Sequence, residues 1–233
     1  MQDSFYYELY YIMFNTGLRA GEVGALMWED VDFTNKCIHV SKSLMCQYED
    51  GNKILRVTTP KTVNSFRTIP FLGKVEEAFI TQKKKQDELK RDLGGRWRSA
   101  EFGNLVFTST MGSPIIRHLL EKDINKVVKT INSIRLMEAT RTGSEYEEFE
   151  RVHPHAIRHT FCSRCFECNM SPKVVQTIMG HAFYSTTMDI YTHVSQNKLE
   201  SDISLYNKLY ETSKELYENQ FDDNSVKEII NYE

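Results

Sequence analysis

The spacing of apolar residues along the chain predicts mostly helices. Residues 4–16, SFYYELYYIMFNT, are apolar on nearly every side, which indicates a buried helix, and Gly17 is the residue expected to end it. A short second helix is expected over residues 20–28. Apolar positions recur at helical spacing in residues 73–92 and 115–137, so each of these segments is predicted to form a longer helix.

The last third of the chain predicts several more helices in close succession. Ser171 followed by Pro172 is typical of a helix start, because proline is well tolerated at the first helical position. The predicted helices cover residues 155–168, 172–180, 186–192 and 196–218.

Strand-like residues are confined to one region. Residues 36–48, 53–58 and 66–71 are rich in β-branched and aromatic residues, and EDGNK and KTVNS separate them as turns. They predict one three-stranded antiparallel sheet. Residues 138–151, EATRTGSEYEEFER, have no apolar period and are expected to form a mobile insertion. The fold class is therefore α+β, mainly α-helical, with one small sheet.

Length and composition indicate a single globular domain. The chain has 233 residues, 40% of them hydrophobic, which is enough to bury a core. We expect this domain to occupy residues 1–218 and a tail to occupy residues 219–233. No run approaches the roughly 18 apolar residues of a membrane span, and no signal pattern opens the chain, so a cytoplasmic protein is expected. Five cysteines without a secretion signal indicate reduced thiols.

The charge distribution is uneven. A net charge of −3 is unusual for a nucleic-acid partner, which ordinarily favours a basic surface. Residues 53–98 are nevertheless rich in lysine and arginine, whereas residues 145–150 and the last forty residues are acidic. The run KKK at 83–85 is interpreted as a solvated helix face.

Three cysteines at positions i, i+3 and i+6 have a spacing found in some metal sites. Cys162, Cys165 and Cys168 resemble the start of an iron–sulfur motif, with His159 just upstream, but a fourth cysteine is absent. The same spacing lies along one side of a helix, where free cysteines are ordinary core residues. Core packing is the favoured interpretation, and a metal protein is a distant alternative that metal analysis would test.

Several cationic and aromatic residues stand in short motifs. The segment HPHAIRHT places His155 and Arg158 on one face of a helix, and MGHA places His181 beside a glycine at a helix end. Each motif alone is weak. The full set, in chain order, is Arg19 in TGLRAGE, Lys61 in TTPKTVNSFRTIP, His155, Arg158, His181, and Tyr191 in MDIYTHV.

Together these motifs resemble the tyrosine recombinase (phage integrase) family, whose signature is Arg…Lys…His-x-x-Arg…His…Tyr. The six positions occur in the family's order, and ten residues separate His181 from Tyr191, close to the family's spacing. The resemblance covers residues 5 to 195 and is strongest to integrases of conjugative transposons, because of the segment TTPKT…RTIP. It implies the tyrosine-recombinase catalytic fold.

The resemblance implies an enzyme that cuts and rejoins DNA through a 3′-phosphotyrosyl intermediate, with Tyr191 as the nucleophile. Attack on a phosphodiester builds negative charge on the non-bridging oxygens, and the guanidiniums of Arg19 and Arg158 can stabilise it. This chemistry requires no metal ion and no other cofactor. The expected partner of HPHAIRHT is therefore a phosphate rather than zinc.

The resemblance also implies roles for the other residues of the set. His155 and His181 would donate hydrogen bonds to the phosphate, and either could take the tyrosine proton. Lys61 fits the general acid that protonates the departing 5′-hydroxyl. His153 and His159 are expected to be structural, and Glu22 is expected to brace an arginine.

The implied partners are double-stranded DNA, at element ends and at the target site, and further copies of the chain in a tetrameric synapse. Accessory DNA-bending or excision proteins are possible partners as well. The segment SVKEIINYE places Ser225 and Glu228 in capping-box register, and this tail is expected to dock on a neighbouring protomer. The acidic residues 145–150 are expected to point away from DNA or to contact another protomer.

The chain also departs from the family. Only eighteen residues precede Arg19, so the core-binding and arm-binding domains are expected to be absent and DNA affinity of the chain alone is expected to be poor. Two alternatives to a recombinase remain. One is a catalytically silent DNA-binding or assembly module of the same fold, and the other is a type IB topoisomerase.

Overall fold

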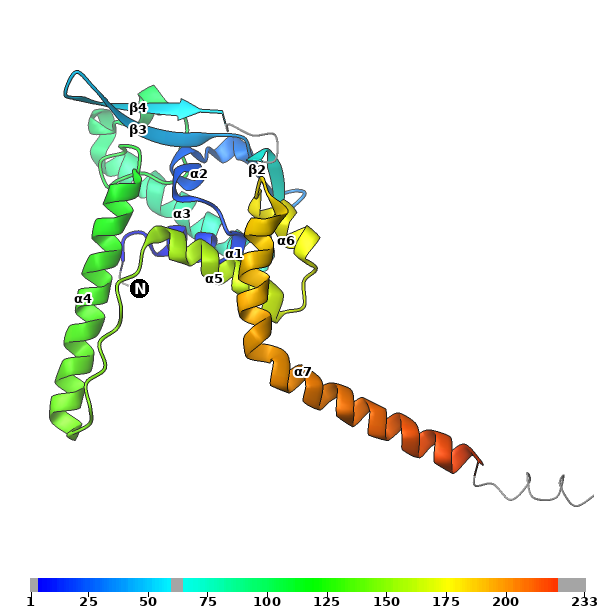
Figure 1. Ribbon diagram of the computed structural model, residues 1–233. Helices are drawn as coiled ribbons and strands as arrows, with labels where there is room; N and C mark the ends of the chain where they lie inside the picture. The colour runs from blue at the N-terminus through cyan, green and yellow to red at the C-terminus, as the bar shows by residue number, and fades with distance from the viewer. Residues whose placement is uncertain (1–3, 60–64, 222–233) are drawn as a thin grey trace, which may run out of the picture. The chain divides into compact units, whose positions relative to one another are not determined.

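The computed structural model describes residues 4–59 and 65–221 (Figure 1). They form two units, one ending at Ile190 and the other beginning at Tyr191. The expected fold class, mainly helical α+β with small antiparallel sheets, is confirmed. The helices are α1 (Tyr7–Thr16), α2 (Ala20–Ala25), α3 (Gly73–Leu93), α4 (Arg117–Thr142), α5 (Pro154–Glu167), α6 (Pro172–Met179) and α7 (Tyr184–Phe221), with short 3-10 turns η1 (Trp28–Asp30), η3 (Gly94–Arg96) and η4 (Ser99–Phe102). The strands are β1 (Val31–Asp32), β2 (Cys37–Val40), β3 (Ser43–Glu49), β4 (Asn52–Thr58) and β5 (Arg67–Pro70).

Helix α1 lies in the core of the first unit. It contacts both α3 and α5, and Leu9, Ile12 and Met13 are completely buried. This agrees with its apolar sequence on nearly every side. On α3, the fully buried Phe79 contacts the rings of Trp28, Phe33 and Phe71, so this helix is held against the sheet region by aromatic packing.

The predicted small three-stranded antiparallel sheet is present, but only part of the predicted strand region belongs to it, and the rest forms a second, two-stranded sheet. Strands β1, β2 and β5 form an antiparallel sheet with Ile38 opposite Ile69, and both residues are buried in the core. Strands β3 and β4 pair with each other, through a two-residue turn in which Asp50 and Gly51 have positive φ. The predicted strand 36–48 is thus divided between a core sheet and a largely exposed hairpin.

Two helices are longer than expected. Helix α4 continues to Thr142, and α7 runs through the gap expected at residues 193–195. In α4 the extension contains Ala139, which is buried, and Gly143 ends it in the left-handed conformation. The α7 extension contains no proline or glycine to stop the helix.

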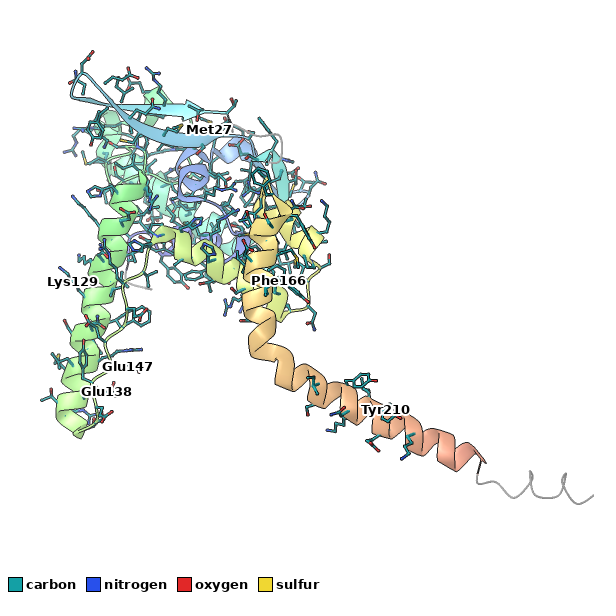
Figure 2. All side chains as sticks on the ribbon, in the orientation of Figure 1. Met27, Lys129, Glu138, Glu147, Phe166 and Tyr210 are labelled. Carbon is teal, nitrogen blue, oxygen red and sulfur yellow. The ribbon has the colours of Figure 1, made fainter. Side chains whose placement is uncertain are left out.

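The rest of the expected insertion, residues 144–150, has no regular secondary structure and returns alongside α4 (Figure 1). Phe149 exchanges hydrogen bonds with the Asn132 side chain, at 2.8 and 3.0 Å. Glu147 lies beside Glu138 near the far end of α4 (Figure 2). Residues 144–150 therefore have defined contacts with the helix, although their expected mobility stays a prediction.

The second unit contains most of α7. Its large apolar residues Ile203, Tyr206 and Tyr210 are exposed, and the two tyrosine rings stack with centroids 6.4 Å apart. The capping-box pair expected in the tail, Ser225 and Glu228, lies outside the described residues. None of the described helices combines the length and the apolar character that a membrane span requires.

Candidate active site

The site is built around the turn between α1 and α2. Gly17 ends α1 with φ +66°, and a Cβ at this position would lie 2.5 Å from the ring of Phe161 on α5. Only glycine fits both the conformation and the space. The sharp turn makes Arg19 the residue before the first turn of α2, so its side chain extends toward the end of α6.

Three arginines from separate elements donate to the carboxyl end of α6. Carbonyl groups in the last turn of a helix have no partner within the helix and carry its partial negative charge, so cations are stabilised there. The three acceptors are consecutive residues. Arg67 on β5 donates from Nε to the Ile178 carbonyl (2.6 Å), Arg158 on α5 from Nη2 to the Met179 carbonyl, and Arg19 from Nη2 to the Gly180 carbonyl (2.9 Å).

Glu22 is the carboxylate at the centre of this cluster. It is 5% exposed and accepts from the backbone and the guanidinium of Arg19, at 2.8 and 2.7 Å, and from both Nη atoms of Arg67, at 2.9 and 2.8 Å. Burial alone would raise the pKa of Glu22, but the hydrogen bonds and charges of Arg67 and Arg19 lower it to about 2. Glu22 therefore stays ionised and braces two arginines, where the sequence predicted one.

Arg158 lies beneath the surface. It is 1% exposed, and its Nη1 donates to the Gly17 carbonyl at 2.6 Å. Burial, with the nearby charge of Arg19, lowers the pKa of Arg158 to about 9, so the guanidinium remains a cation at neutral pH. The cluster of Arg19, Arg67, Arg158 and Glu22 thus holds three positive charges against one negative charge.

His181 follows the cluster directly. Its Nδ1 lies 2.9 Å from Thr187 Oγ1, a bond that fixes the ring. Burial, reinforced by the charges of Arg158 and Arg19, lowers the pKa of His181 to about 4. The imidazole is therefore neutral at neutral pH and able to accept a proton.

His155 is exposed on the same helix as Arg158. Its ring meets that of His159 edge to face, with centroids 4.6 Å apart. Partial burial and the charges of His159, Arg158 and Arg19 lower the pKa of His155, so it too favours the neutral form. His153 and His159 are both exposed, and burial in the core does not account for either.

Four of the six predicted site residues lie around the end of α6. Arg19 and Arg158 donate to its last carbonyls, His181 follows it directly, and His155 is on α5 with Arg158. Lys61 lies outside the described residues. Tyr191 is the first residue of the second unit and is 37% exposed. The roles of all six residues stay predictions.

Arg67 is the cluster member that the sequence reasoning missed. It stands in FRTIP, which was noted only as a flank of the lysine motif. A usable signal was present in Glu22. A buried carboxylate requires cationic partners, and its geometry leaves room for more than one guanidinium.

The cysteines are consistent with packing. Cys162 and Cys165 are buried, and burial raises the pKa of their thiols to about 12 and about 11, as expected of thiols packed in a core. Among the side chains that the structure describes, three potential metal ligands lie within 4.8 Å of one another only at Asp32, Cys37 and His39. The Asp32 carboxylate there already accepts from Thr34 and Asn35 within its own turn.

Comparison with known proteins agrees with this geometry. The chain matches the Phage integrase family over residues 3–198, and it therefore belongs to that family. It is 31% identical over 207 residues to a "Tyrosine recombinase XerC-like" protein of Caldanaerobacter subterraneus subsp. tengcongensis, a match that covers 87% of the chain and 49% of that protein. It is 29% identical over 204 residues to the "Transposase from transposon Tn916" of Enterococcus faecalis, which covers 87% of the chain and 45% of that protein.

A solved structure shows the same fold. The Tn1549 transposon integrase, residues 82–397, in complex with circular intermediate DNA, superimposes with a TM-score of 0.65 at 27% identity. The match covers 84% of the chain and 59% of that protein. The chain spans about half the length of the curated relatives it matches.

Proposed function

We propose that the chain is the catalytic part of an integrase that moves a mobile element, cutting and rejoining DNA strands through a 3′-phosphotyrosyl intermediate. The observation that carries the proposal is the cluster of Arg19, Arg67 and Arg158 around Glu22. The cluster has a net charge of +2. This complements the transition state of phosphodiester attack, which carries one negative charge from the phosphate and one from the attacking phenolate.

Each residue has a role that follows from its position. Arg19, with a side chain 35% exposed, is the arginine that can contact the non-bridging oxygens directly. Arg158 acts from beneath, where the low dielectric strengthens its field. His155 and His181, both favouring the neutral form, hydrogen-bond the phosphate, and either can take the tyrosine proton.

The remaining steps fall to Tyr191 and Lys61. Tyr191 attacks the phosphorus, its Oη–P bond forms as the P–O5′ bond breaks, and Lys61 protonates the departing 5′-hydroxyl. A second 5′-hydroxyl reverses the step and rejoins the strands. Because the phosphotyrosyl bond conserves the energy of the bond it replaces, this scheme needs no ATP. The arginines supply the positive charge that a metal ion gives to other phosphoryl-transfer enzymes, so the scheme needs no metal ion.

The proposed partners are double-stranded DNA and further copies of the chain, assembled as a tetramer on DNA, with accessory DNA-bending or excision proteins. Two structures of one relative support DNA as the substrate. Tn1549 integrase has been solved with transposon right end DNA and with circular intermediate DNA. The proposed tail, residues 219–233, would dock on a neighbouring protomer.

A nicked suicide duplex tests the proposal. The protein is incubated in excess EDTA, and covalent adduct is followed on a denaturing gel. We expect the protein on the 3′ side of the break and a free 5′-hydroxyl opposite, and no adduct from Tyr191→Phe, which lacks only the nucleophilic oxygen. Protein linked to a 5′ end, or cleavage that EDTA abolishes, would contradict the mechanism.

Two alternatives give different results in the same assay. A catalytically silent module would bind the duplex and form no adduct. A type IB topoisomerase would relax supercoiled DNA without a partner site, whereas the proposed integrase exchanges strands between two sites. The recombinase is favoured because the two relatives described above, each matched over 87% of the chain, are named a tyrosine recombinase and a transposase.

A further inference from the structure

Arg67 connects separate elements of the fold, although the sequence predicted no role for it. Its side chain is 3% exposed, and it leaves β5 toward two other elements. Both Nη atoms donate to Glu22 on α2, and Nε donates to the Ile178 carbonyl near the end of α6. One guanidinium therefore joins β5, α2 and α6.

We propose that Arg67 is a positioning residue for strand cleavage, which sets Arg19 through Glu22 and sets His181 through the Ile178 carbonyl. The inference rests on the proposed function. Arg67 itself does not contact the phosphate in this scheme.

The first connection passes through Glu22. The two oxygens of this carboxylate are shared between Arg67 and Arg19, so the plane that Arg67 imposes on the carboxylate also sets the direction of the Arg19 guanidinium. Arg19 is the more exposed partner, with a side chain 35% exposed. Without Arg67, the carboxylate can turn toward Arg19 alone and draw it away from the position that a phosphate would occupy.

The second connection passes through the end of α6. Gly180 leaves the helix in the left-handed conformation, and the His181 amide donates to the Gln176 carbonyl at 3.3 Å, which is a long bond. The bond from Arg67 to Ile178 (2.6 Å) is shorter and comes from a buried charged donor. Arg67 therefore fixes the position of the last turn of α6, and His181 follows this turn directly.

Lysine cannot replace this arginine. The fork of a guanidinium presents parallel donors to a carboxylate and a further donor in another direction, whereas an ammonium is a single point. Arg67→Lys keeps the charge beside Glu22 but cannot make all three bonds. Arg67→Lys therefore changes the geometry of the donor group while keeping its positive charge.

The test compares Arg67→Lys with Ile69→Val, a control on the same strand that removes one buried methyl group without touching charge. Single-turnover cleavage is measured on two suicide duplexes, one with an ordinary scissile phosphate and one with a methylphosphonate there. The methylphosphonate lacks the phosphate's negative charge and so depends less on a correctly placed Arg19. Hydrogen exchange of the Gly180 and His181 amides is followed in the free protein.

We expect Arg67→Lys to lower cleavage of the ordinary duplex on the order of 10²-fold, the loss typical of a catalytic group displaced by about 1 Å. The loss should be much smaller on the methylphosphonate, DNA affinity should be unchanged, and exchange at Gly180 and His181 should accelerate. Ile69→Val should affect both duplexes equally and only slightly.

A second variant guards against loss of folding. Glu22→Gln/Arg67→Met leaves neither member of the pair as an uncompensated buried charge, so it should fold and still show the selective cleavage defect. Equal losses on both duplexes, or unchanged exchange at the end of α6, would overturn the positioning role. A wild-type protein that forms no adduct would instead overturn the proposed function, and the exchange measurement would then decide whether Arg67 holds α6.

Discussion

The cluster at the end of α6 contains buried arginine and glutamate side chains, whereas exposed ones occur on α4 and on the segment that returns along it. In the cluster, Arg158 is 1% exposed and donates to two backbone carbonyls, and Glu22 is shared by two guanidiniums. On α4, the exposed Arg135 lies over the ring of Phe149 at 5.3 Å and donates to the Glu147 carbonyl at 3.3 Å.

The difference shows what burial does to a charge. A buried ion must have its hydrogen bonds made by the protein, so its position is tightly determined and the loss of one partner is costly. An exposed ion is solvated in any arrangement, and its contacts contribute little. Matched substitutions in the two regions can test this contrast.

The largest effect is expected for Arg158→Lys. The single ammonium nitrogen cannot occupy both Nη positions from which Arg158 donates to Gly17 and Met179, and loss of one preorganised electrostatic group typically costs about 10²–10³ in rate. Single-turnover adduct formation is the measurement. Arg135→Lys is the matched change on α4 and should leave the rate unchanged, and equal effects of the two would remove the distinction between the regions.

Glu22→Gln should be strongly destabilising at neutral pH, because it leaves buried Arg67 without its counterion. The lowered pKa of Glu22, about 2 against an ordinary value of 4.5, corresponds to a stabilisation on the order of 3 kcal/mol. A carboxyl with a lowered pKa stabilises the folded protein above pH 4.5, and this contribution is lost as the pH falls toward 2. Denaturant unfolding should therefore show wild type and variant converging over that range.

Glu148→Gln serves as the control for this pH experiment, since Glu148 is exposed on the returning segment. Its effect on the free energy of unfolding should stay within about 0.5 kcal/mol. A difference between wild type and Glu22→Gln that does not change with pH would mean that packing, rather than ionisation, accounts for the loss.

Two glycines with the same backbone conformation sharpen the contrast further. Gly17 has φ +66° and Gly143 has φ +71°, but a Cβ at Gly17 would meet Phe161 at 2.5 Å, whereas nothing lies within 4 Å of one at Gly143. Alanine at either position costs about 1–2 kcal/mol of backbone strain. Gly17→Ala should cost about 1–3 kcal/mol more through overpacking, measured as a lower melting temperature. Equal shifts would show that Phe161 moves aside freely.

The smallest effect is expected for Phe149→Ala. The ring is 36% exposed, and its contact with Arg135 is worth about 0.5–1 kcal/mol. Denaturant unfolding should detect a change of about that size, with adduct formation unaltered. Phe79→Ala, in the core, should cost about 3–5 kcal/mol. A large effect at Phe149 would mean that the returning segment is part of the cooperative core.

Much of the local structure could be predicted from the sequence. Gly17 ends α1, Pro172 is the first residue of α6, and the Ser171 hydroxyl accepts from the Val174 amide. The division of residues 36–48 between two sheets could not be predicted, because Val40 and Leu44 are equally suited to a strand. Whether a strand pairs with β5 or with its own hairpin partner depends on the other segments that pack against it.

The candidate site divides in the same way. The sequence by itself determined the order and type of Arg19, His155, Arg158 and His181, and it marked Glu22 as a brace. Only the tertiary structure decided that Arg67 shares this carboxylate, and that three guanidiniums meet consecutive carbonyls of α6. Helix caps and turns involve residues one to four positions apart, so local preferences express them. Arg67 and Ile178 are 111 positions apart, and Arg19 and Gly180 are 161 apart, so only the packing of the core brings each pair together.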